Sequence, residues 1–565
     1  MSEPPKPITL PEFCKEKWLL LAGVIVYGTT AWCSVGHYGT DEHFQILEFA
    51  NYKLGLTPIN DLPWEFPARV RSGLQPMLAY GAIRAADTLG ANSPFTQVFL
   101  LRLITGLLCL WMYFGWSRHL AESPDSKQTS RRLQWVVVFL WFMPFLSVRF
   151  SSENVAALAF WGGLLLILKG LRGPDASRNL EESAPRPQSE RANVQRPIVA
   201  IRTVLGGFLL GLSFYFRFQM GFAILGVGAW IAWQFLTGNK DALPVNRLAL
   251  ALVGSLAAIG VGAVADLWMY GAPVFTPYRY LQANILEGKA AGFGTAPWWW
   301  YFYRVLLLTG PPIGIPGLGL AAMGLWRNRN HVMTWALIPF LLAHLAISHK
   351  ELRFMFPMLL PVLVMALYGL RELTTARILV STPGHFLLGS GISGTVRGML
   401  ASIGLSHPIS PRSRSRPLAI GGIHSLIAVA IGLNFLLLPA RCLLPAEEAI
   451  RCFSFLYDAS RTQTRTVFSE GRSAYTLWGL ETHFYRDANI RTVIVSDMAA
   501  GLQRVASTPD GMWLSTDPAI AAPPGMQVRR LYAYLPARPG WSWLTRGERR
   551  LYVWTVAKIS TSVGD

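Results

Sequence analysis

Two adjacent acids, Asp41 and Glu42, follow the first long apolar run of the chain. They lie in the stretch GHYGTDEHFQILEFANYKLG, residues 36–55, in which Thr40 is a suitable N-cap and Gly55 a natural helix stop. Both acids are therefore expected in the first turn of a helix, where the helix dipole favours the ionised carboxylate. Acids are common at helix starts without any catalytic role, so two interpretations stay open: a simple helix start, or a general base at the mouth of a membrane helix.

A second group of ionisable residues interrupts the apolar runs near residue 350. The stretch SHKELRF, residues 348–354, contains His349, Lys350, Glu351 and Arg353. Charges this dense at a membrane boundary cost free energy unless they are paired, either with one another or with a ligand. Lys350 and Arg353 could bind a lipid phosphate, with Glu351 orienting them.

One further arginine, Arg217 in LSFYFRFQMG, lies within an apolar window. An unpaired arginine at the centre of a membrane helix costs about 2.5–3.5 kcal/mol on the translocon scale. We therefore expect Arg217 to reach either the membrane interface or a partner, and a phosphate contact is the outcome that we favour.

An aromatic stretch between residues 266 and 305 combines ring faces with polar groups. Its polar candidates are Asn284, Glu287 and Lys289, and its rings include Trp298, Trp299, Trp300 and Tyr301. Such aromatics are typical of a membrane interface. Sugars also stack on aromatic faces, so a surface for a glycan or a lipid headgroup is an equally natural interpretation.

The elements that must position these residues are membrane helices. The chain has 565 residues, of which 52% are hydrophobic, and it includes 21 Trp. About eleven apolar windows could span a bilayer within residues 18–438. They are 18–35, 97–117, 133–148, 153–169, 203–216, 218–236, 248–266, 304–325, 333–347, 354–370 and 418–438. Arg149 and Arg217 divide the regions 133–169 and 201–236, so each region is expected to be a hairpin or a broken helix.

The cations indicate the topology. The net charge is +19, yet Lys and Arg gather in short connections and form no continuous basic face, which argues against a nucleic-acid partner. By the positive-inside rule, residues 1–17 and the polar linkers 171–199 and 372–417 are expected to be cytoplasmic. The loops 36–96 and 267–303 are then expected to face outward, away from ATP and nucleotide sugars.

The last part of the chain, residues 440–565, changes character. Runs such as RTVIVSDM and RRLYVWTVAK predict strands of a small soluble α/β domain, which an odd number of spans would place outside the membrane. The five cysteines show neither a metal-ligand spacing nor a CxxC motif. Among them, only Cys442 and Cys452 are predicted to be able to pair.

Five of these stretches together resemble glycosyltransferase family 22, the lipid-linked mannosyltransferases of N-glycan and glycosylphosphatidylinositol assembly. They are YGTDEHFQILEFANYKLG, WEFPARVRSGLQP, GLSFYFRFQMG, DLWMYGAPVFTPYRYLQANILEGKAAGFGTAPWWWYF and HKELRFMFP. The resemblance covers residues 18–370, and the branch that adds the third mannose of the glycosylphosphatidylinositol core is the nearest likeness. It implies an all-α polytopic membrane protein of the GT-C fold, here followed by the α/β domain.

The resemblance also implies roles for residues. Asp41 becomes the candidate general base and Glu42 its neighbour, although Tyr38, Gly39 and Thr40 replace the residues that usually precede the acids, so which acid is the base stays open. The candidates for binding the donor phosphate are Arg217, His349, Lys350 and Arg353. The candidates for binding the acceptor or sugar are Arg71, Asn284, Glu287, Trp298, Trp299 and Tyr301.

The implied reaction moves mannose from a polyprenyl-phosphate donor to a lipid-linked glycan or glycolipid acceptor in a single displacement that inverts the anomeric centre. We expect membrane lipids as further partners and no cofactor, while a divalent metal bridging the acids to phosphate remains compatible with this chemistry. The expected location is a bacterial inner membrane or the endoplasmic reticulum, with the active site on the extracytoplasmic or lumenal face. A lipid or glycolipid transporter is the alternative, although no repeated halves are visible in the sequence.

Overall fold

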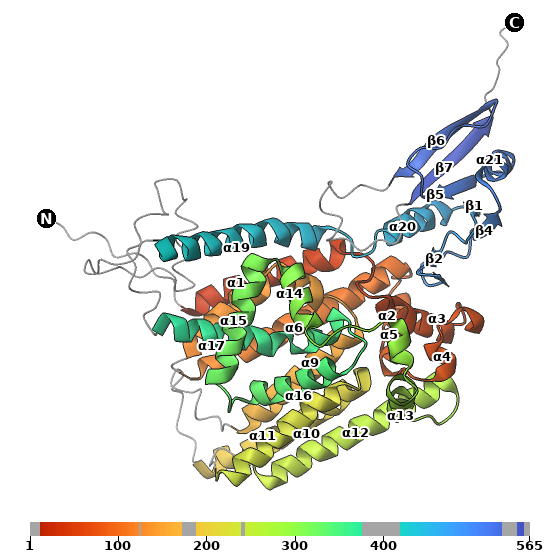
Figure 1. Cartoon of the computed structure of the whole chain (residues 1–565). Coiled ribbons are helices and arrows are strands. Elements are labelled where there is room, and N and C mark those ends of the chain that lie inside the picture. Colours follow the sequence, from red (N-terminus) through yellow and green to blue (C-terminus); the bar gives the residue numbers. More distant parts are fainter. Residues whose placement is uncertain are drawn as a thin grey trace, which may run out of the picture.

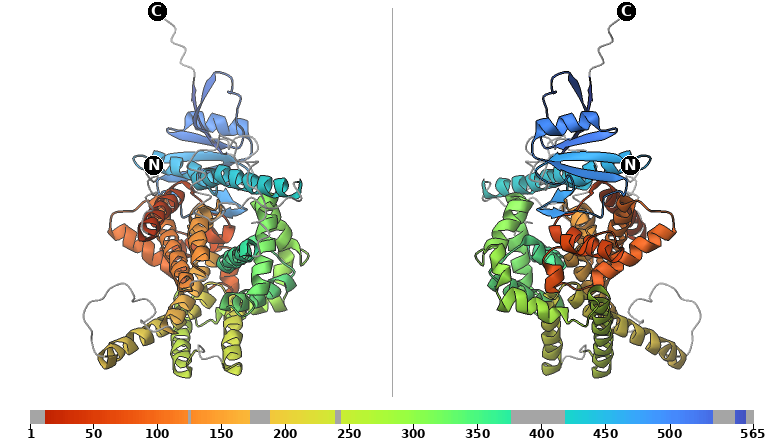
Figure 2. Two further views of the ribbon diagram at one scale, coloured as in Figure 1. Left: turned by 90° about the vertical axis from the view of Figure 1, so that its left-hand side faces the viewer. Right: turned by 90° about the vertical axis from the view of Figure 1, so that its right-hand side faces the viewer.

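The computed structural model describes residues 12–123, 126–171, 188–238, 243–375, 418–533 and 551–558. Helices make up the described part of the chain as far as α19 (Leu418–Leu443), and a small sheet domain stands above one end of this bundle (Figures 1 and 2). The predicted fold class, an all-α polytopic bundle followed by a small α/β domain, is confirmed.

The bundle helices follow the apolar windows. They are α1 (Glu12–Cys33), α6 (Pro94–Ala121), α7 (Lys127–Phe139), α8 (Met143–Ser147), α9 (Ser152–Leu171), α10 (Gln188–Phe216), α11 (Met220–Leu236), α12 (Val245–Tyr270), α14 (Trp300–Thr309), α15 (Pro311–Arg327), α16 (Val332–Ala346), α17 (Leu359–Thr375) and α19 (Leu418–Leu443). Within the described ranges, five helical segments are long and apolar enough to cross a membrane: Pro94–Ala121, Ser152–Lys169, Pro197–Phe216, Val245–Tyr270 and Leu352–Thr374. The chain is therefore a multi-pass membrane protein.

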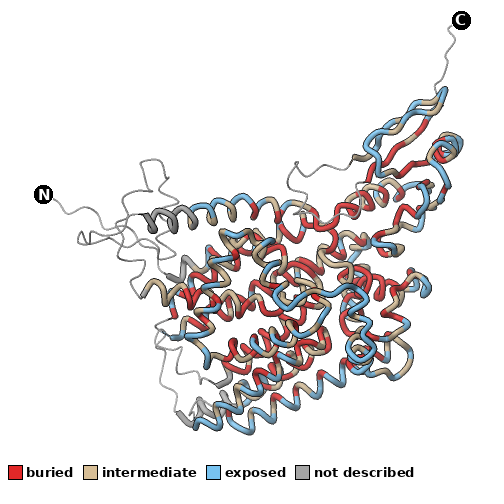
Figure 3. Tube along the Cα trace, viewed as in Figure 1, coloured by how far each residue is buried: buried red, intermediate tan, exposed pale blue. Residues whose placement is uncertain are grey.

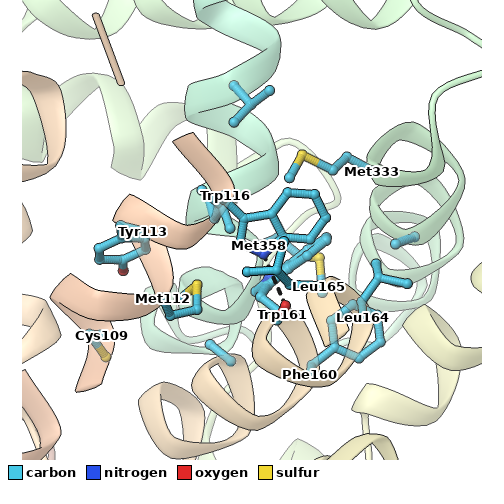
Figure 4. Packing of buried hydrophobic residues seen from close by; sticks show 14 of the residues in the cluster. Cys109, Met112, Tyr113, Trp116, Phe160, Trp161, Leu164, Leu165, Met333 and Met358 are labelled. Carbon is cyan, nitrogen blue, oxygen red and sulfur yellow. Dashed lines mark hydrogen bonds between the residues drawn. The ribbon is translucent and has the colours of Figure 1, made fainter. Parts of the chain in front are cut away.

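Buried residues concentrate inside the helical bundle (Figure 3). Large aromatic side chains contribute to this core, where Trp116 and Trp161 are fully buried (Figure 4). Each indole N–H has a partner, as buried Trp requires. Trp116 Nε1 donates to the carbonyl of Trp161 at 2.9 Å, and Trp161 Nε1 donates to the carbonyl of Pro357 at 2.7 Å. The second bond fastens the 3₁₀ segment η7 (Leu352–Met358) to α9, which matters because η7 carries Arg353.

Short helices gather at the end of the bundle that also carries the sheet domain (Figure 1). The first loop forms α2 (Thr40–Glu42), the π-helical segment η1 (His43–Leu47), α3 (Glu48–Lys53), η2 (Ile59–Asp61), α4 (Glu65–Ala68) and α5 (Leu74–Thr88). The second loop forms α13 (Thr276–Leu281), the π-helical segment η5 (Gln282–Leu286) and η6 (Lys289–Phe293). The predicted candidate site residues thus lie mainly on short elements that the long helices support.

The C-terminal domain contains α20 (Ala449–Ser460), α21 (Met498–Ser507) and seven strands among the described residues. The strands are β1 (Arg465–Glu470), β2 (Thr476–Leu477), β3 (Leu480–Glu481), β4 (Ile490–Val495), β5 (Gly511–Ser515), β6 (Met526–Ala533) and β7 (Tyr552–Lys558). The main sheet has the order β4-β1-β5-β7-β6, in which β1 pairs in parallel with β4 and β5 while β7 runs antiparallel to β5 and β6. Both strands predicted from RTVIVSDM and RRLYVWTVAK are present as β4 and β7.

Three local predictions are corrected. Thr40 is the first helical residue rather than the N-cap, which is Gly39 without any side-chain capping bond. The linker 171–199 is helical from Gln188 onward, where Gln, Glu, Arg and Ala favour α10. Cys442 and Cys452 do not pair: both are free and buried, Cys442 beside Thr30 of α1 and Cys452 in the core beneath the sheet domain.

Two boundaries also shift. The loop 267–303 begins later and ends earlier, because α12 continues to Tyr270 and α14 begins at Trp300.

Arg149 and Arg217 lie at breaks between helices, as their charge predicted: Arg149 stands between α8 and α9, and Arg217 between α10 and α11. In the linker 372–417, α17 continues to Thr375, and residues 376–417 lie outside the described residues.

Candidate active site

Asp41 lies in the first turn of a helical run that begins at Thr40, continues through α2, η1 and α3, and ends at Lys53, shortly before Gly55. Gly39 precedes the run in an extended conformation with φ −120° and ψ 145°. A Cβ at Gly39 would lie 2.9 Å from Nη1 of Arg353, so this glycine leaves room for a guanidinium group beside the first turn. The local backbone thus brings a cation to the acid that follows it.

Two guanidinium groups contact the Asp41 carboxylate. Nη1 of Arg353 lies 3.0 Å from Oδ2 of Asp41, and Nη2 of Arg71 lies 3.2 Å from the same oxygen. Arg353 also forms a two-point pair with Glu351, with Nε 2.7 Å from Oε2 and Nη2 2.9 Å from Oε1. Such forked pairs fix the plane of the guanidinium group.

Glu153 extends this cluster toward Arg217. Oε1 of Glu153 lies 3.1 Å from Nη2 of Arg217 and 3.8 Å from Nε of Arg353, and the Glu153 and Arg217 side chains are almost fully buried. The guanidinium of Arg217 also lies 4.8 Å from the ring centre of Phe354. The ion cluster therefore consists of Asp41, Glu153, Glu351, Arg71, Arg217 and Arg353, three carboxylates with three guanidinium groups.

Glu153 was missed in the sequence analysis. It stands at the first residue of an apolar window, where hydropathy treats an acid as the edge of a span. Glu153 follows Arg149 closely and lies in the first turn of α9. An acid at a helix N-terminus at the membrane boundary is a signal that could have identified it. An acid there is a natural partner for the otherwise unexplained Arg217.

Side chains near the C-terminal end of α12 hold Arg71 in place. Tyr270 Oη donates to the backbone carbonyl of Arg71 at 2.6 Å. Asp266 accepts from the backbone N–H of Gly73 at 2.8 Å and from the hydroxyl of Thr276 at 2.6 Å. These bonds join the first loop to the end of α12, and through Thr276 to α13.

The charges determine the protonation of the acids in the cluster. Burial alone would raise the pKa of Asp41, but Arg353, Arg71 and Arg217 outweigh it and lower that pKa to about 2. Burial would likewise raise the pKa of Glu351, and its pair with Arg353 lowers it instead. Asp41 is thus ionised at neutral pH.

Glu42 does not join the ion cluster. Its Oε2 accepts from the backbone N–H of Tyr38 at 3.0 Å, and it lines a small internal cavity with His37, Arg102 and Tyr485 among others. Burial raises the pKa of Glu42, although Arg149 and the Tyr38 N–H oppose the shift. The two adjacent acids therefore face different surroundings.

Two other predicted phosphate ligands have local partners. Nζ of Lys350 donates to the carbonyls of His344, Leu345 and Ile347, which belong to the end of α16 and the residue that caps it. His349 lies 2.9 Å from the carbonyl of Gly294 and 3.3 Å from Oε1 of Glu351. Lys350 thus caps a helix, while His349 borders the ion cluster through Glu351.

The predicted sugar-binding residues of the second loop are spread out. Asn284 donates to the carbonyl of Tyr280, while Glu287 is exposed and pairs with Lys289 at 3.3 Å. Trp298 and Trp299 are 63% and 49% exposed, whereas Tyr301 is buried. Of the predicted acceptor ligands, only Arg71 has an ion-cluster contact among the described residues. Those residues also contain no group of three or more His, Cys, Asp or Glu side chains arranged to hold a metal ion.

Comparison with known proteins identifies relatives of this chain. The sequence pattern of the Alg9-like mannosyltransferase family matches residues 18–396, more than half of the chain. GPI mannosyltransferase 3 from Yarrowia lipolytica is 27% identical over 342 residues, covering 58% of this chain and 56% of that protein. The human GPI alpha-1,2-mannosyltransferase 3 is 22% identical over 347 residues, covering 59% and 54%. The chain thus spans about half the length of these relatives.

Among solved structures, ArnT from Cupriavidus metallidurans bound to undecaprenyl phosphate is similar over 98% of this chain and 100% of that one. The TM-score is 0.44 and the sequence identity 11%.

Proposed function

Because this chain belongs to the Alg9-like mannosyltransferase family, we propose that it is an integral-membrane mannosyltransferase that uses a polyprenyl-phosphate donor. The acceptor in this proposal is a lipid-linked glycan or glycolipid, the class to which the names of its relatives point. Asp41 is the base, and Arg217 and Arg353 bind the donor phosphate as the sequence analysis expected. We reassign Arg71 from the acceptor to the phosphate, because it contacts the same carboxylate as Arg353. The active site faces the extracytoplasmic or lumenal side.

The single observation that carries this proposal is the ionised carboxylate of Asp41 held between Arg71 and Arg353. A carboxylate can accept a hydroxyl proton, and guanidinium groups bind phosphate with forked geometry. Both kinds of group lie within one cluster that is assembled from distant parts of the chain. Buried ionic clusters are costly to maintain and concentrate at functional sites, which favours a chemical role over a purely structural one.

Binding of the donor would prepare Asp41 for its role. In the empty site the carboxylate is a weak base, because Arg353 and Arg71 stabilise its anionic form. A phosphodiester that draws these cations toward itself removes part of that stabilisation, so the proton affinity of Asp41 rises when the donor is present. Nε of Arg71 is buried without a hydrogen-bond partner among the described residues, and it offers one donor for such a phosphate.

The proposed step balances as a single displacement. The acceptor hydroxyl loses its proton to Asp41 as its oxygen bonds to the anomeric carbon of mannose. The bond from that carbon to the phosphate oxygen breaks, and its electron pair leaves with the polyprenyl phosphate. Arg217 and Arg353 stabilise the charge that develops on this leaving group, and attack from the opposite face inverts the centre.

An assay with the full-length protein in membranes tests the proposal. Radiolabelled polyprenyl-phosphate mannose is supplied with a panel of lipid-linked acceptors, and the products are separated and counted. The expected result is a labelled glycolipid formed from one acceptor class, with the new linkage of α configuration. Donor movement between leaflets without any labelled product would instead favour a transporter, and would contradict the proposal.

A further inference from the structure

Two contacts with the C-terminal domain enclose the segment that carries Asp41. The upstream contact involves the turn between α1 and α2. The carbonyl of Val35 accepts from the backbone N–H groups of Ala446 at 2.7 Å and of Glu447 at 3.2 Å. Gly36 has a φ of +87°, and a Cβ there would lie 2.6 Å from the Cβ of Glu447, so only glycine allows this close approach.

The downstream contact is centred on the carboxylate of Glu48. Its Oε1 accepts from the backbone N–H groups of His483 at 2.9 Å and Phe484 at 3.0 Å, and lies 2.9 Å from Nε2 of His43. Its Oε2 accepts from the hydroxyl of Thr57 at 2.7 Å. Glu48 is 1% exposed, and a buried carboxylate is tolerated only when its lone pairs are satisfied in this way.

Stacked rings reinforce the downstream contact. The ring of Tyr485 stacks on His43 with centroids 5.3 Å apart and planes 9° apart, and it also stacks on Phe95 at 5.0 Å. His483 adds a contact of 2.8 Å between Nε2 and Oδ2 of Asp61. One continuous apolar cluster then joins α3, α5 and α6 to α20 and the sheet. The C-terminal domain is therefore packed against the first outward loop (Figure 1).

The two contacts restrain the helical run that carries Asp41. Val35 precedes Asp41, Glu48 follows it, and the residues from Thr40 to Lys53 form one uninterrupted helical run. A helical run held at its far end and at the turn before its start has little freedom to rotate or slide. The carboxylate of Asp41, which sits on its first turn, is then confined as well. A misplacement of about 1 Å at a reacting group costs up to about 100-fold in rate.

We propose that Glu48 is a positioning residue for Asp41, and that the C-terminal domain is a functional part of the active site through its 482–485 turn. This inference rests on the proposed function for its kinetic readout. Glu48 touches no reacting group in this scheme; it acts by fixing the helix that carries the base. In the 482–485 turn, the groups that bond to Glu48 are backbone N–H groups, which a side-chain substitution does not remove. Glu48 is therefore the residue to vary.

The experiment compares full-length variants Glu48→Ala and Glu48→Gln with the wild type. A glutamine oxygen can still accept from the N–H groups of His483 and Phe484, whereas alanine cannot. Glu481→Ala is the matched control, because Glu481 accepts the hydroxyls of Ser473 and Thr476 entirely within the C-terminal domain. The readouts are kcat, the KM for the polyprenyl-phosphate donor, and hydrogen exchange of the backbone amides from Gly36 to Glu48.

The expected result separates rate from binding. Glu48→Ala lowers kcat by about 10- to 100-fold and leaves the donor KM within about threefold, while its amides exchange faster. Glu48→Gln recovers part of the loss, and Glu481→Ala stays close to the wild type.

Three outcomes would overturn the inference: an unchanged kcat in Glu48→Ala, an equal loss in Glu481→Ala, or failure of both Glu48 variants to accumulate in the membrane, which would assign Glu48 to folding alone. Failure of the wild type to transfer mannose would instead count against the proposed function. In that case, faster hydrogen exchange of the amides from Gly36 to Glu48 in Glu48→Ala, but not in Glu481→Ala, still supports the proposal that Glu48 fixes the helix carrying Asp41. Unchanged exchange in Glu48→Ala overturns it.

Discussion

Nη1 of Arg353, in η7, lies 3.0 Å from Oδ2 of Asp41, so the SHKELRF stretch supplies a cation to the acid that follows α1. The sequence placed both residues at membrane boundaries but did not place them in contact. The ion pair between them joins the segment around Asp41 and the SHKELRF stretch in one site.

Asp41→Asn should reduce mannosyl transfer by about 100- to 10,000-fold, the usual contribution of a general base. Asparagine keeps the shape of the side chain but cannot take the proton. Binding of the polyprenyl-phosphate donor should persist, measured with labelled donor on purified protein. Asp87→Asn is the control, because Asp87 contacts Gln97 at 2.7 Å, away from the ion cluster. Normal transfer by Asp41→Asn would exclude Asp41 as the base.

Glu42→Gln should keep transfer within about tenfold of the wild type, since this side chain acts outside the ion cluster and a glutamine oxygen can replace its single bond to the Tyr38 N–H. Transfer rates of this variant and of Asp41→Asn, measured side by side, distinguish the two acids. A larger loss in Glu42→Gln than in Asp41→Asn would reverse the assignment.

How far the sequence predicted this arrangement can be seen in particular residues. Hydropathy located the helical windows. The charge of Arg217 predicted that it reaches the membrane interface or a partner, and in the structure it pairs with a carboxylate. The partner itself, Glu153, was missed because an acid at the edge of an apolar window resembles an ordinary span boundary. Lys350 was predicted to bind a phosphate because of its position at a membrane boundary. In the structure its ammonium group donates to carbonyls at the end of α16.

Sequence patterns did not predict that the C-terminal domain packs against the segment that carries Asp41 and Glu48. Glu48 is an acid in a short helix, and its partners in the C-terminal domain are backbone N–H groups of residues 483 and 484, which no side-chain pattern encodes. The cysteine prediction failed for a related reason, because proximity in sequence says little about which faces of α19 and α20 their thiols occupy. Local periodicity therefore predicted elements, and tertiary contacts determined the site.

Glu153→Gln should destabilise the protein by about 3–5 kcal/mol, because it leaves a buried guanidinium without its anion. Thermal unfolding in detergent measures this loss. The double variant Glu153→Gln/Arg217→Gln should lose less than the single variant, since removing both charges leaves none unpaired. Added polyprenyl phosphate should raise the Tm of Glu153→Gln more than that of the wild type, because the ligand then supplies the missing anion. Equal shifts would argue against phosphate binding at Arg217.

The stability conferred by Asp41 should depend on acid pH. Its pKa falls from 3.8 to about 2 in the folded protein, because Arg353, Arg71 and Arg217 outweigh the opposing effect of burial. A lowered carboxylate pKa adds stability that is fully present above the ordinary value and is lost as pH falls through the folded value. The Tm difference between wild type and Asp41→Asn should therefore be constant from pH 7 to about 5 and shrink below about 4. A difference that disappeared near pH 6 would contradict the ion pairs.

Gly39→Ala should slow transfer about tenfold while leaving the fold intact. The added methyl would lie 2.9 Å from Nη1 of Arg353, so the guanidinium must move, and it can do so because it ends a flexible side chain. Its movement lengthens the contact with Asp41, which disturbs both the base and the proposed phosphate site. Steady-state kinetics should show a lower kcat and a higher donor KM together. Gly81→Ala is the matched control, because no atom lies within 4 Å of a Cβ at that position in α5, and it should behave as the wild type. Wild-type kinetics for Gly39→Ala would mean that the placement of Arg353 beside Asp41 is not needed for the reaction.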